Sequence, residues 1–224
     1  MTTLSVPELI IFDWEGTLLD INAHIISSVR TAVSKVQVEF PGDDAIREVM
    51  GLSLPAAIQH LFPAIGATKQ AELFREFRNA YIALNETSAP LYPNVEVVLK
   101  SLSEQKIKLA IATGKGRIGL EHDLTQSKVR SYFVATRCAE ETFSKPHPAM
   151  VLELLDELHT EPGNTLVVGD SSNDILMAKN ANVKSIAAAY GTNSKEELAR
   201  YEPDAIILSI NEITTLFKME FDKR

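Results

Sequence analysis

Short apolar runs recur along the chain, separated by longer stretches in which apolar residues repeat at helical spacing. The runs are continuous in hydrophobicity, which is typical of strands that are covered on both faces. Strands alternating with helices predict an α/β core with a doubly wound, Rossmann-like parallel sheet. The predicted strands are Leu9–Phe12, Leu109–Ala112, Tyr132–Ala135, Leu166–Val168, Ser185–Ala189 and Ala205–Leu208.

One stretch breaks this alternation. Between residues 21 and 86 the apolar spacing is helical and no run is convincing as a strand. We therefore expect an all-α domain at residues 21–86, inserted after the first strand, and an α/β core made of residues 1–20 and 87–224. Asp20 to Asn22 and Thr87 to Pro93 are the expected hinges between them.

Two helix starts can be predicted from capping residues. Asn94 precedes the helical apolar spacing of Val98 and Leu102 and is expected to cap that helix. Ser194 and Glu197 have the spacing of a capping box and are expected to open another.

Charge and composition exclude several classes of protein. The 224 residues carry 22 Lys and Arg against 30 Asp and Glu, a net charge of -8, which repels nucleic-acid phosphates. No apolar stretch approaches the roughly 20 residues of a membrane helix, so we expect neither a membrane nor a nucleic acid as partner. The run Leu9–Phe12 is too short for a signal peptide. The single Cys138 cannot form an internal disulfide, and we expect a cytoplasmic protein.

Polar clusters follow three of the predicted strands, at the ends where an open parallel sheet presents its ligand-binding loops. A fourth cluster places a lysine between a serine and a proline just ahead of a predicted helix. The position of these polar clusters at the strand ends is the main indication of an enzyme. The clusters are Asp13-Trp14-Glu15-Gly16-Thr17, Thr113-Gly114-Lys115, Gly169 to Asp174, and Ser144-Lys145-Pro146.

The residue types in these clusters suit phosphate chemistry. Asp13 and Asp170 would bring two carboxylates together, which is unfavourable unless a hard cation lies between them, and Mg²⁺ prefers such oxygen ligands. Thr113 offers a hydroxyl, Gly114 an unhindered backbone N–H, and Lys145 a fixed positive charge to an anion. The sequence therefore predicts a site for Mg²⁺ and a small phosphorylated metabolite.

Catalytic roles can be assigned within this inventory. An aspartate beside a metal and a lysine can attack phosphorus, and Asp13 is the expected nucleophile of an aspartyl-phosphate pathway. Glu15 could protonate the leaving oxygen and then deprotonate the attacking water, as a general acid and base. Asp174, one helical turn beyond Asp170, is expected to hold Lys145 or a metal-bound water from behind.

The four ordered clusters resemble the motifs of the haloacid dehalogenase-like hydrolases, and are most similar to the phosphoglycolate phosphatase-like branch. Members of that branch insert a helical cap after the first motif, as residues 21–86 would here. The resemblance implies a Mg²⁺-dependent phosphatase acting on a phosphomonoester. It also implies that Asp13, the backbone carbonyl of Glu15 and Asp170 hold the metal, and that Thr113, Gly114, Lys145 and Trp14 bind phosphate.

Glu15 departs from the family pattern, because the phosphatases of this family usually have aspartate there. The added methylene displaces the carboxyl by one carbon–carbon bond, and misplacements of ~1 Å can cost ~100-fold in rate. We hypothesise that Glu15 still serves as acid and base. The alternative that this residue favours is a non-catalytic protein that binds a phosphate ligand without turnover.

A second alternative comes from a glycine-rich segment. Gly114 to Gly119 fits a dinucleotide-binding fingerprint, and the acidic Glu140 follows about 20 residues later. An NAD-binding protein would leave Asp13, Lys145 and Asp170 without a role.

The helical insertion is expected to cover the leaving group and to set substrate choice. Arg47, close to the segment from Met50 to Ser53, could meet a carboxylate or a second phosphate. The sequence identifies neither the phosphomonoester nor the oligomeric state.

Overall fold

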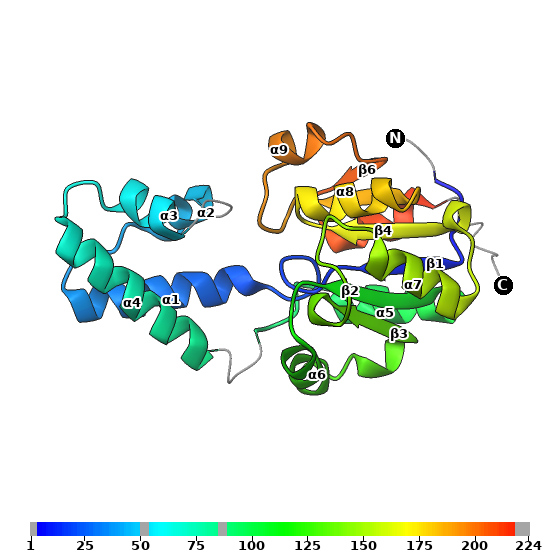
Figure 1. Cartoon of the computed structure of the whole chain (residues 1–224), viewed down its shortest axis with the longest axis horizontal. Coiled ribbons are helices and arrows are strands. Elements are labelled where there is room, and N and C mark those ends of the chain that lie inside the picture. Colours follow the sequence, from blue (N-terminus) through cyan, green and yellow to red (C-terminus); the bar gives the residue numbers. More distant parts are fainter. Residues whose placement is uncertain (1–3, 50–53, 85–88, 218–224) are drawn as a thin grey trace. The chain divides into compact units, whose positions relative to one another are not determined.

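The computed structural model describes residues 4–49, 54–84 and 89–217 of the chain. The chain divides into two compact units, Met1–Leu19 with Pro90–Arg224, and Asp20–Ala89. The larger unit contains the sheet and the smaller one contains helices α1 to α4 (Figure 1). Within the described ranges, no helix is both long enough and apolar enough to cross a membrane.

The larger unit is built on a six-stranded parallel sheet with the order β3-β2-β1-β4-β5-β6. The prediction of a doubly wound α/β core is confirmed. Because β1 has β2 on one side and β4 on the other, the strand order reverses at β1, and ligands bind at such a point outside the carboxyl ends of the strands. The strands are β1 (Leu9–Phe12), β2 (Lys108–Thr113), β3 (Ala135–Cys138), β4 (Thr165–Gly169), β5 (Lys184–Ala188) and β6 (Ala205–Ile207).

One predicted strand was misplaced. The run Tyr132–Ala135 was expected to be a strand, but Arg130–Tyr132 forms a 3₁₀ turn and β3 begins only at Ala135. The strand continues through Arg137, a residue that a search for buried apolar runs rejects. Since β3 lies at the sheet edge and pairs only with β2, a polar residue is tolerated there. The other predicted strands agree with the structure to within one residue at each end.

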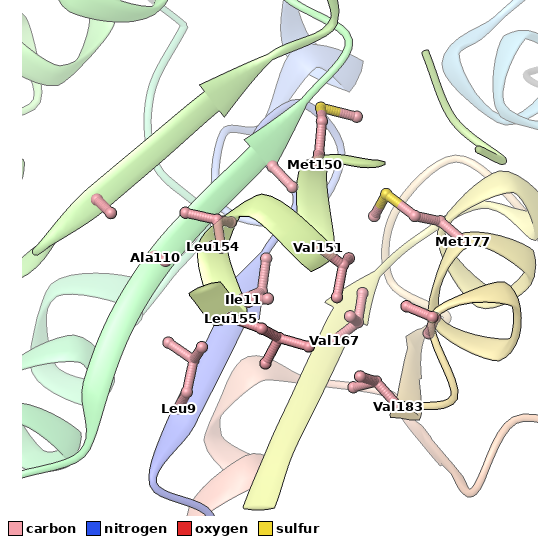
Figure 2. Packing of buried hydrophobic residues seen from close by; sticks show 14 residues of the cluster. Leu9, Ile11, Ala110, Met150, Val151, Leu154, Leu155, Val167, Met177 and Val183 are labelled. Atoms are coloured by element: carbon pink, nitrogen blue, oxygen red, sulfur yellow. The ribbon is translucent and has the colours of Figure 1, made fainter. Parts of the chain in front are cut away.

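Helices cover the sheet on both faces and supply the remaining core. On one face, α7 and α8 place a buried apolar cluster over β1, β2 and β4, as Figure 2 shows. Leu154 of α7 and Ile11 of β1 are fully buried in it. The helices of this unit are α5 (Val95–Glu104), α6 (Arg117–Gln126), α7 (Ala149–Leu158), α8 (Ser172–Asn180), α9 (Lys195–Ala199) and α10 (Ile213–Leu216), with 3₁₀ turns at Arg130–Tyr132, Ala139–Glu141, Pro162–Asn164 and Ile210–Glu212.

One of the two predicted helix caps is confirmed and the other was wrong. The Ser194 side chain accepts a hydrogen bond from the Glu197 backbone N–H, and the Glu197 carboxylate accepts one from the Ser194 backbone N–H, so the capping box is confirmed. Helix α5 does begin after Asn94, but the prediction that the Asn94 side chain caps it was wrong. Asn94 instead adopts the left-handed backbone conformation, with φ 68°, which asparagine tolerates better than most residues.

The described residues of the smaller unit form four helices joined by short connections, without a strand among them. Its buried core is formed mainly by the last turns of α1 packed against α3 and α4, with Val33, Ile58 and Leu73 among the buried side chains. Asp20 accepts a hydrogen bond from the backbone N–H of Asn22 and so caps α1. The helices are α1 (Ile21–Val36), α2 (Asp43–Val49), α3 (Leu54–Leu61) and α4 (Ala67–Leu84).

Two sequence expectations concern this unit and its connections. Arg47 forms an exposed ion pair with Asp44, with Nη1 2.8 Å from Oδ1, one turn away on the same helix. Nothing in this contact singles Arg47 out for a ligand, and its neighbours from Met50 to Ser53 lie outside the described residues. The expected return hinge Thr87 to Pro93 also begins outside them.

Candidate active site

The carboxyl ends of β1 and β4 bring two acidic residues together. Phe12 pairs with Val168, and the Asp13 backbone N–H donates to the Val168 carbonyl, so Asp13 and Asp170 leave adjacent strands almost level with each other. Asp174 reaches the same place from the first turn of α8. Carboxylate oxygens of Asp13, Asp170 and Asp174 all lie within 4.8 Å of one another, and all three residues are buried. We refer to these three residues with Lys145 as the acidic pocket.

Lys145 links two of these carboxylates. Its Nζ lies 2.6 Å from Asp13 Oδ1 and 2.6 Å from Asp174 Oδ1. The other oxygen of Asp174 accepts hydrogen bonds from the backbone N–H and the hydroxyl of Ser171, at 3.1 and 2.6 Å. Asp174 therefore takes part in the capping box of α8 and contacts Lys145 at the same time.

The charge in this pocket is out of balance. Burial raises the pKa of Asp13 well above its usual range, although Lys145 opposes this, and the neighbouring carboxylates of Asp174 and Asp170 add to the rise. Burial and the charge of Asp174 likewise raise the pKa of Asp170. Burial would lower the pKa of Lys145, but Asp13 and Asp174 outweigh it and the pKa is raised. One ammonium group cannot neutralise three carboxylates, so the site favours a further cation.

The donor atoms suit Mg²⁺. Asp13 and Asp170 offer hard carboxylate oxygens, and no histidine or cysteine takes part in the acidic cluster of the described residues. Asp170 is held in place, since Oδ2 accepts from the Thr192 backbone N–H at 2.7 Å and Oδ1 from the Thr17 hydroxyl at 3.3 Å. This orientation of an acidic ligand by fixed donors is what metal sites require.

Two glycines let the backbone approach Asp170 closely. A Cβ on Gly16, whose φ is +83°, would collide with the Asp170 carboxylate, and a Cβ on Gly191 would collide with the Asp170 side chain and the Gly16 carbonyl. The segment containing Gly191 and Thr192 was not predicted from the sequence. The available signal was its position, because this polar pair follows the β5 strand as the other clusters follow theirs.

A cavity of about 320 Å³ opens beside the acidic pocket. It collects most of the residues that the sequence singled out. Ser144, Ser171 and Asn173, which also line it, belong to the predicted clusters, whereas Thr192 was not predicted. The expected residues that line it are Asp13, Glu15, Thr113, Gly114, Lys145 and Asp170. Asp174 is buried and is not among the described lining residues, but its Oδ1 lies 2.6 Å from Nζ of the lining residue Lys145.

Thr113 and Trp14 differ in what they offer to a phosphate. The Thr113 hydroxyl oxygen accepts a hydrogen bond from the Lys115 backbone N–H at 3.1 Å, which leaves the hydroxyl hydrogen available to an anion in the cavity. The Trp14 side chain points elsewhere: it is fully buried, packs edge-to-face on Phe133, and its Nε1 donates to Asp123 Oδ2 at 3.0 Å. Only the backbone of Trp14 could serve a phosphate.

Glu15 lines the cavity but is held by a cation. Its Oε1 lies 2.8 Å from Lys115 Nζ, which also lies 2.9 Å from Asp123 Oδ2. Burial would lower the pKa of Lys115, but the two carboxylates outweigh it and the pKa is raised. Neither the partner of Glu15 nor the role of Asp123 was anticipated from the sequence.

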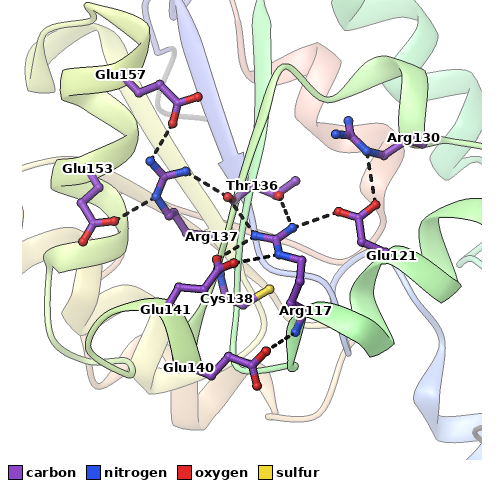
Figure 3. Close-up of polar contacts among 10 residues, drawn as sticks. All are labelled: Arg117, Glu121, Arg130, Thr136, Arg137, Cys138, Glu140, Glu141, Glu153 and Glu157. Atoms are coloured by element: carbon purple, nitrogen blue, oxygen red, sulfur yellow. Dashed lines mark hydrogen bonds and ion pairs between the residues drawn. The ribbon is translucent and has the colours of Figure 1, made fainter.

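The structure also explains the glycine-rich segment that resembles a dinucleotide fingerprint. Glu140 Oε1 accepts a hydrogen bond from the Arg117 backbone N–H at 2.7 Å, so a carboxylate fills the N-terminus of α6 (Figure 3). A Cβ on Gly116 would come within 2.9 Å of that carboxylate. A pyrophosphate would need this helix terminus, because its N–H groups attract anions. The arrangement argues against the NAD-binding alternative.

Comparisons with known proteins identify similar sequences and structures. Residues 10–188 match the family model described as haloacid dehalogenase-like hydrolase. The pyrophosphatase PpaX of Oceanobacillus iheyensis is 28% identical over 92% of this chain and 95% of its own, and a phosphoglycolate phosphatase of Agrobacterium fabrum is 30% identical over 92% and 91%. A crystal structure described as a predicted phosphoglycolate phosphatase from Haemophilus somnus superimposes with a TM-score of 0.71 at 25% identity, covering 95% of this chain and 99% of that one.

Proposed function

Since the chain belongs to the haloacid dehalogenase-like hydrolases, we propose that it is a Mg²⁺-dependent phosphatase that hydrolyses a small phosphomonoester through an aspartyl-phosphate on Asp13. The observation that carries the proposal is the acidic pocket itself. A carboxylate at the end of β1 lies 2.6 Å from a lysine whose side chain is only 10% exposed, and shares a cluster of carboxylate oxygens with Asp170 and Asp174. This combination provides a nucleophile, a fixed positive charge and a place for a divalent cation.

Mg²⁺ would be held by Asp13, Asp170 and the backbone carbonyl of Glu15. When bound, it supplies a positive charge that offsets the repulsion between the carboxylates and phosphate and that stabilises charge on the phosphoryl oxygens. The raised pKa values of Asp13 and Asp170 support this proposal, because a cation at the cluster favours the ionised carboxylates that burial disfavours.

The chain's own residues would carry out the two half-reactions. Asp13 attacks phosphorus, the bond from phosphorus to the ester oxygen breaks, and Glu15 gives that oxygen a proton. Lys145, the Thr113 hydroxyl and the Gly114 backbone N–H hold the phosphoryl oxygens in line with the nucleophile. Water then attacks the aspartyl-phosphate while Glu15 takes its proton, and inorganic phosphate leaves with Asp13 restored.

The helical unit, residues 21–86 in our assignment, is proposed as the cap that selects the leaving group. The matched relatives are named as a pyrophosphatase and as phosphoglycolate phosphatases. Pyrophosphate and phosphoglycolate, the compounds in these names, are both small phosphorylated anions. A compound of that class is the proposed substrate. A cytoplasmic location remains our proposal, supported by a single cysteine, Cys138, that is buried and unpaired.

A phosphate-release screen over small phosphomonoesters and pyrophosphate, with Mg²⁺ or with EDTA, tests the proposal. We expect phosphate release with Mg²⁺, its loss in EDTA, and none above background from Asp13→Asn. Release that is equal in EDTA or in Asp13→Asn would contradict the proposal.

A second candidate function is favoured by one observation, the engagement of Glu15 by Lys115 at 2.8 Å. If Glu15 never leaves this partner, the protein binds a phosphate ligand and does not turn it over. Calorimetry with Mg²⁺ and inorganic phosphate separates the two functions. Binding without hydrolysis of any ester in the screen would favour the non-catalytic protein.

A further inference from the structure

Lys115 is a cation with a position fixed by its surroundings. Its side chain is only 15% exposed, and its carbon stem lies over Gly119 in the first turns of α6. A Cβ on Gly119 would lie 2.8 Å from Lys115 Cε, so the last glycine of the apparent dinucleotide fingerprint provides the space that the lysine stem occupies.

Behind Lys115 lies a buried anchor. The Asp123 side chain is 3% exposed, and its Oδ2 accepts a hydrogen bond from Trp14 Nε1 at 3.0 Å while lying 2.9 Å from Lys115 Nζ. The Trp14 ring is fully buried. An ammonium held by a buried carboxylate, which is itself held by a buried indole, has little freedom to move.

Trp14, Asp123, Lys115 and Glu15 contact one another in series, and Glu15 is the exposed end of this series. Its side chain is 31% exposed, its Oε1 contacts Lys115 Nζ, and it is the one member of the chain Trp14–Asp123–Lys115–Glu15 that lines the described cavity. Glutamate has one more rotatable bond than aspartate, so an unpartnered Glu15 would sample several positions at the edge of the cavity. Lys115 removes that freedom.

We propose that Lys115 is a positioning residue that holds the Glu15 carboxylate in reach of the reacting phosphate, so that Glu15 and Lys115 work as a matched pair. This inference rests on the proposed phosphatase function. Lys115 does not exchange the proton itself. It fixes the position from which Glu15 does so, and Asp123 with Trp14 fixes Lys115.

Two other roles for Lys115 make different predictions. If Lys115 binds the substrate anion directly, its removal raises KM whatever residue stands at position 15. If Lys115 only neutralises the buried Asp123, its removal lowers thermal stability and slows the enzyme equally in any background. The matched pair alone predicts that the effect on kcat depends on the length of the side chain at position 15.

A kinetic double-mutant cycle distinguishes these roles. The four enzymes carry Lys115 or Lys115→Met combined with Glu15 or Glu15→Asp, and kcat, KM and the unfolding temperature are measured for each with p-nitrophenyl phosphate and Mg²⁺. Lys100→Met, which removes a lysine that is 65% exposed on α5, is the control in both backgrounds. Lys115→Arg, which keeps the charge, tests for rescue.

We expect Lys115→Met to lower kcat by about 100-fold in the Glu15 enzyme, the size of effect that a misplacement of about 1 Å produces. In the Glu15→Asp enzyme, whose shorter carboxylate does not depend on Lys115, kcat should change by no more than about twofold, the usual error of additivity. Lys115→Arg should lose less kcat than Lys115→Met. The fall in unfolding temperature should be similar in both backgrounds, because Asp123 loses its partner in each.

Equal losses of kcat in the two backgrounds, or a change confined to KM, would overturn the matched pair while leaving the phosphatase proposal intact. A wild-type enzyme that releases no phosphate from any ester would overturn both. The two failures are therefore distinguishable in one set of assays.

Discussion

Two clusters of acidic residues lie on the sheet-bearing unit, and they differ in how far their negative charge is neutralised by neighbouring cations. The first is the acidic pocket, where burial raises the pKa of Asp13 and Asp170. The second, which we call the arginine network, joins α6, β3, the 3₁₀ turn after β3 and α7 (Figure 3). Its members are Arg117, Glu121, Arg130, Thr136, Arg137, Cys138, Glu140, Glu141, Glu153 and Glu157.

In the arginine network the carboxylates meet guanidinium groups at the surface. Arg117 contacts Glu141 at 2.7 Å, and Arg137 contacts Glu153 and Glu157 at 2.9 and 2.6 Å. A hydrogen bond from Arg117 lowers the pKa of Glu141, and hydrogen bonds from Thr142 and Arg137 lower that of Glu153. These carboxylates already have their cations within the fold.

The acidic pocket is short of positive charge, because among the described residues Lys145 is the one cation that forms ion pairs with its three carboxylates, and it pairs with two of them, Asp13 and Asp174. Keeping such groups ionised and buried costs folding free energy, which a bound cation and substrate recover. The difference between the clusters teaches that an acidic cluster indicates a ligand site only where the fold leaves its charge unsatisfied. Substitutions in each cluster should therefore have different consequences.

The largest effect is expected from Asp13→Asn. An amide cannot attack phosphorus, so phosphate release should fall by at least about 1000-fold, as when other enzymes lose a nucleophile. Steady-state phosphate release with Mg²⁺ measures this. Asp156→Asn, an exposed aspartate of α7, is the matched control and should retain full activity.

The next effect concerns the metal. Adding Mg²⁺ to the wild type should raise the unfolding temperature, since a ligand at 100 times its Kd stabilises by about 2.7 kcal/mol. Asp170→Asn should abolish this rise. In EDTA at neutral pH, however, the variant should be more stable than the wild type by on the order of 1 kcal/mol, or about 2–4 °C, because a costly buried charge is gone.

The pH dependence of that difference follows from the raised pKa of Asp170. In the folded metal-free protein this carboxyl binds a proton more tightly than in the unfolded chain, whose aspartate pKa is about 3.9. The stability that it contributes is complete below that value and is lost as the pH rises through the folded-state pKa. The advantage of Asp170→Asn in EDTA should therefore vanish toward pH 4. An advantage that persists there would mean that the charge is not its cause.

A smaller effect is expected at α6, because Arg117 of this helix belongs to the arginine network and Gly119 supports Lys115, the partner of Glu15. Gly119→Ala should move the flexible end of Lys115, whose Cε would lie 2.8 Å from the new Cβ. We expect kcat to fall by about tenfold. The unfolding temperature should not fall, because alanine favours a helix by up to about 1 kcal/mol over glycine. Gly163→Ala, where a Cβ meets nothing within 4 Å, is the control, and equal kcat values in the two variants would argue against the positioning of Lys115.

The smallest effect should come from the arginine network. Arg137→Met removes the ion pairs to Glu153 and Glu157, whose side chains are 43% and 45% exposed. Exposed pairs of this kind contribute about 0–1 kcal/mol each, so urea unfolding should show a loss of at most about 2 kcal/mol for the two pairs. Phosphate release should be unchanged. A loss of activity would show that the two clusters are coupled and that the comparison between them fails.

The sheet and the acidic pocket could be predicted from the sequence for the same physical reason. Strands such as β1 and β4 are continuous apolar runs, and the residues that follow them must meet at one edge of a parallel sheet. The bounds of the edge strand β3 were predicted wrongly, because a strand at the sheet edge tolerates a polar residue such as Arg137 and is not a continuous apolar run. The contact between Trp14 and Asp123 could not be predicted either, because it joins residues 109 positions apart and no local sequence pattern indicates it.

The central claim is that Asp13 carries the phosphoryl group, and mass spectrometry of enzyme quenched in acid during turnover tests it most directly. The account predicts a phosphoryl adduct on the peptide that contains Asp13 when the enzyme is incubated with a hydrolysed ester and Mg²⁺, and none on Asp13→Asn. An adduct on another residue, or phosphate release from Asp13→Asn at the rate of the wild type, would contradict it.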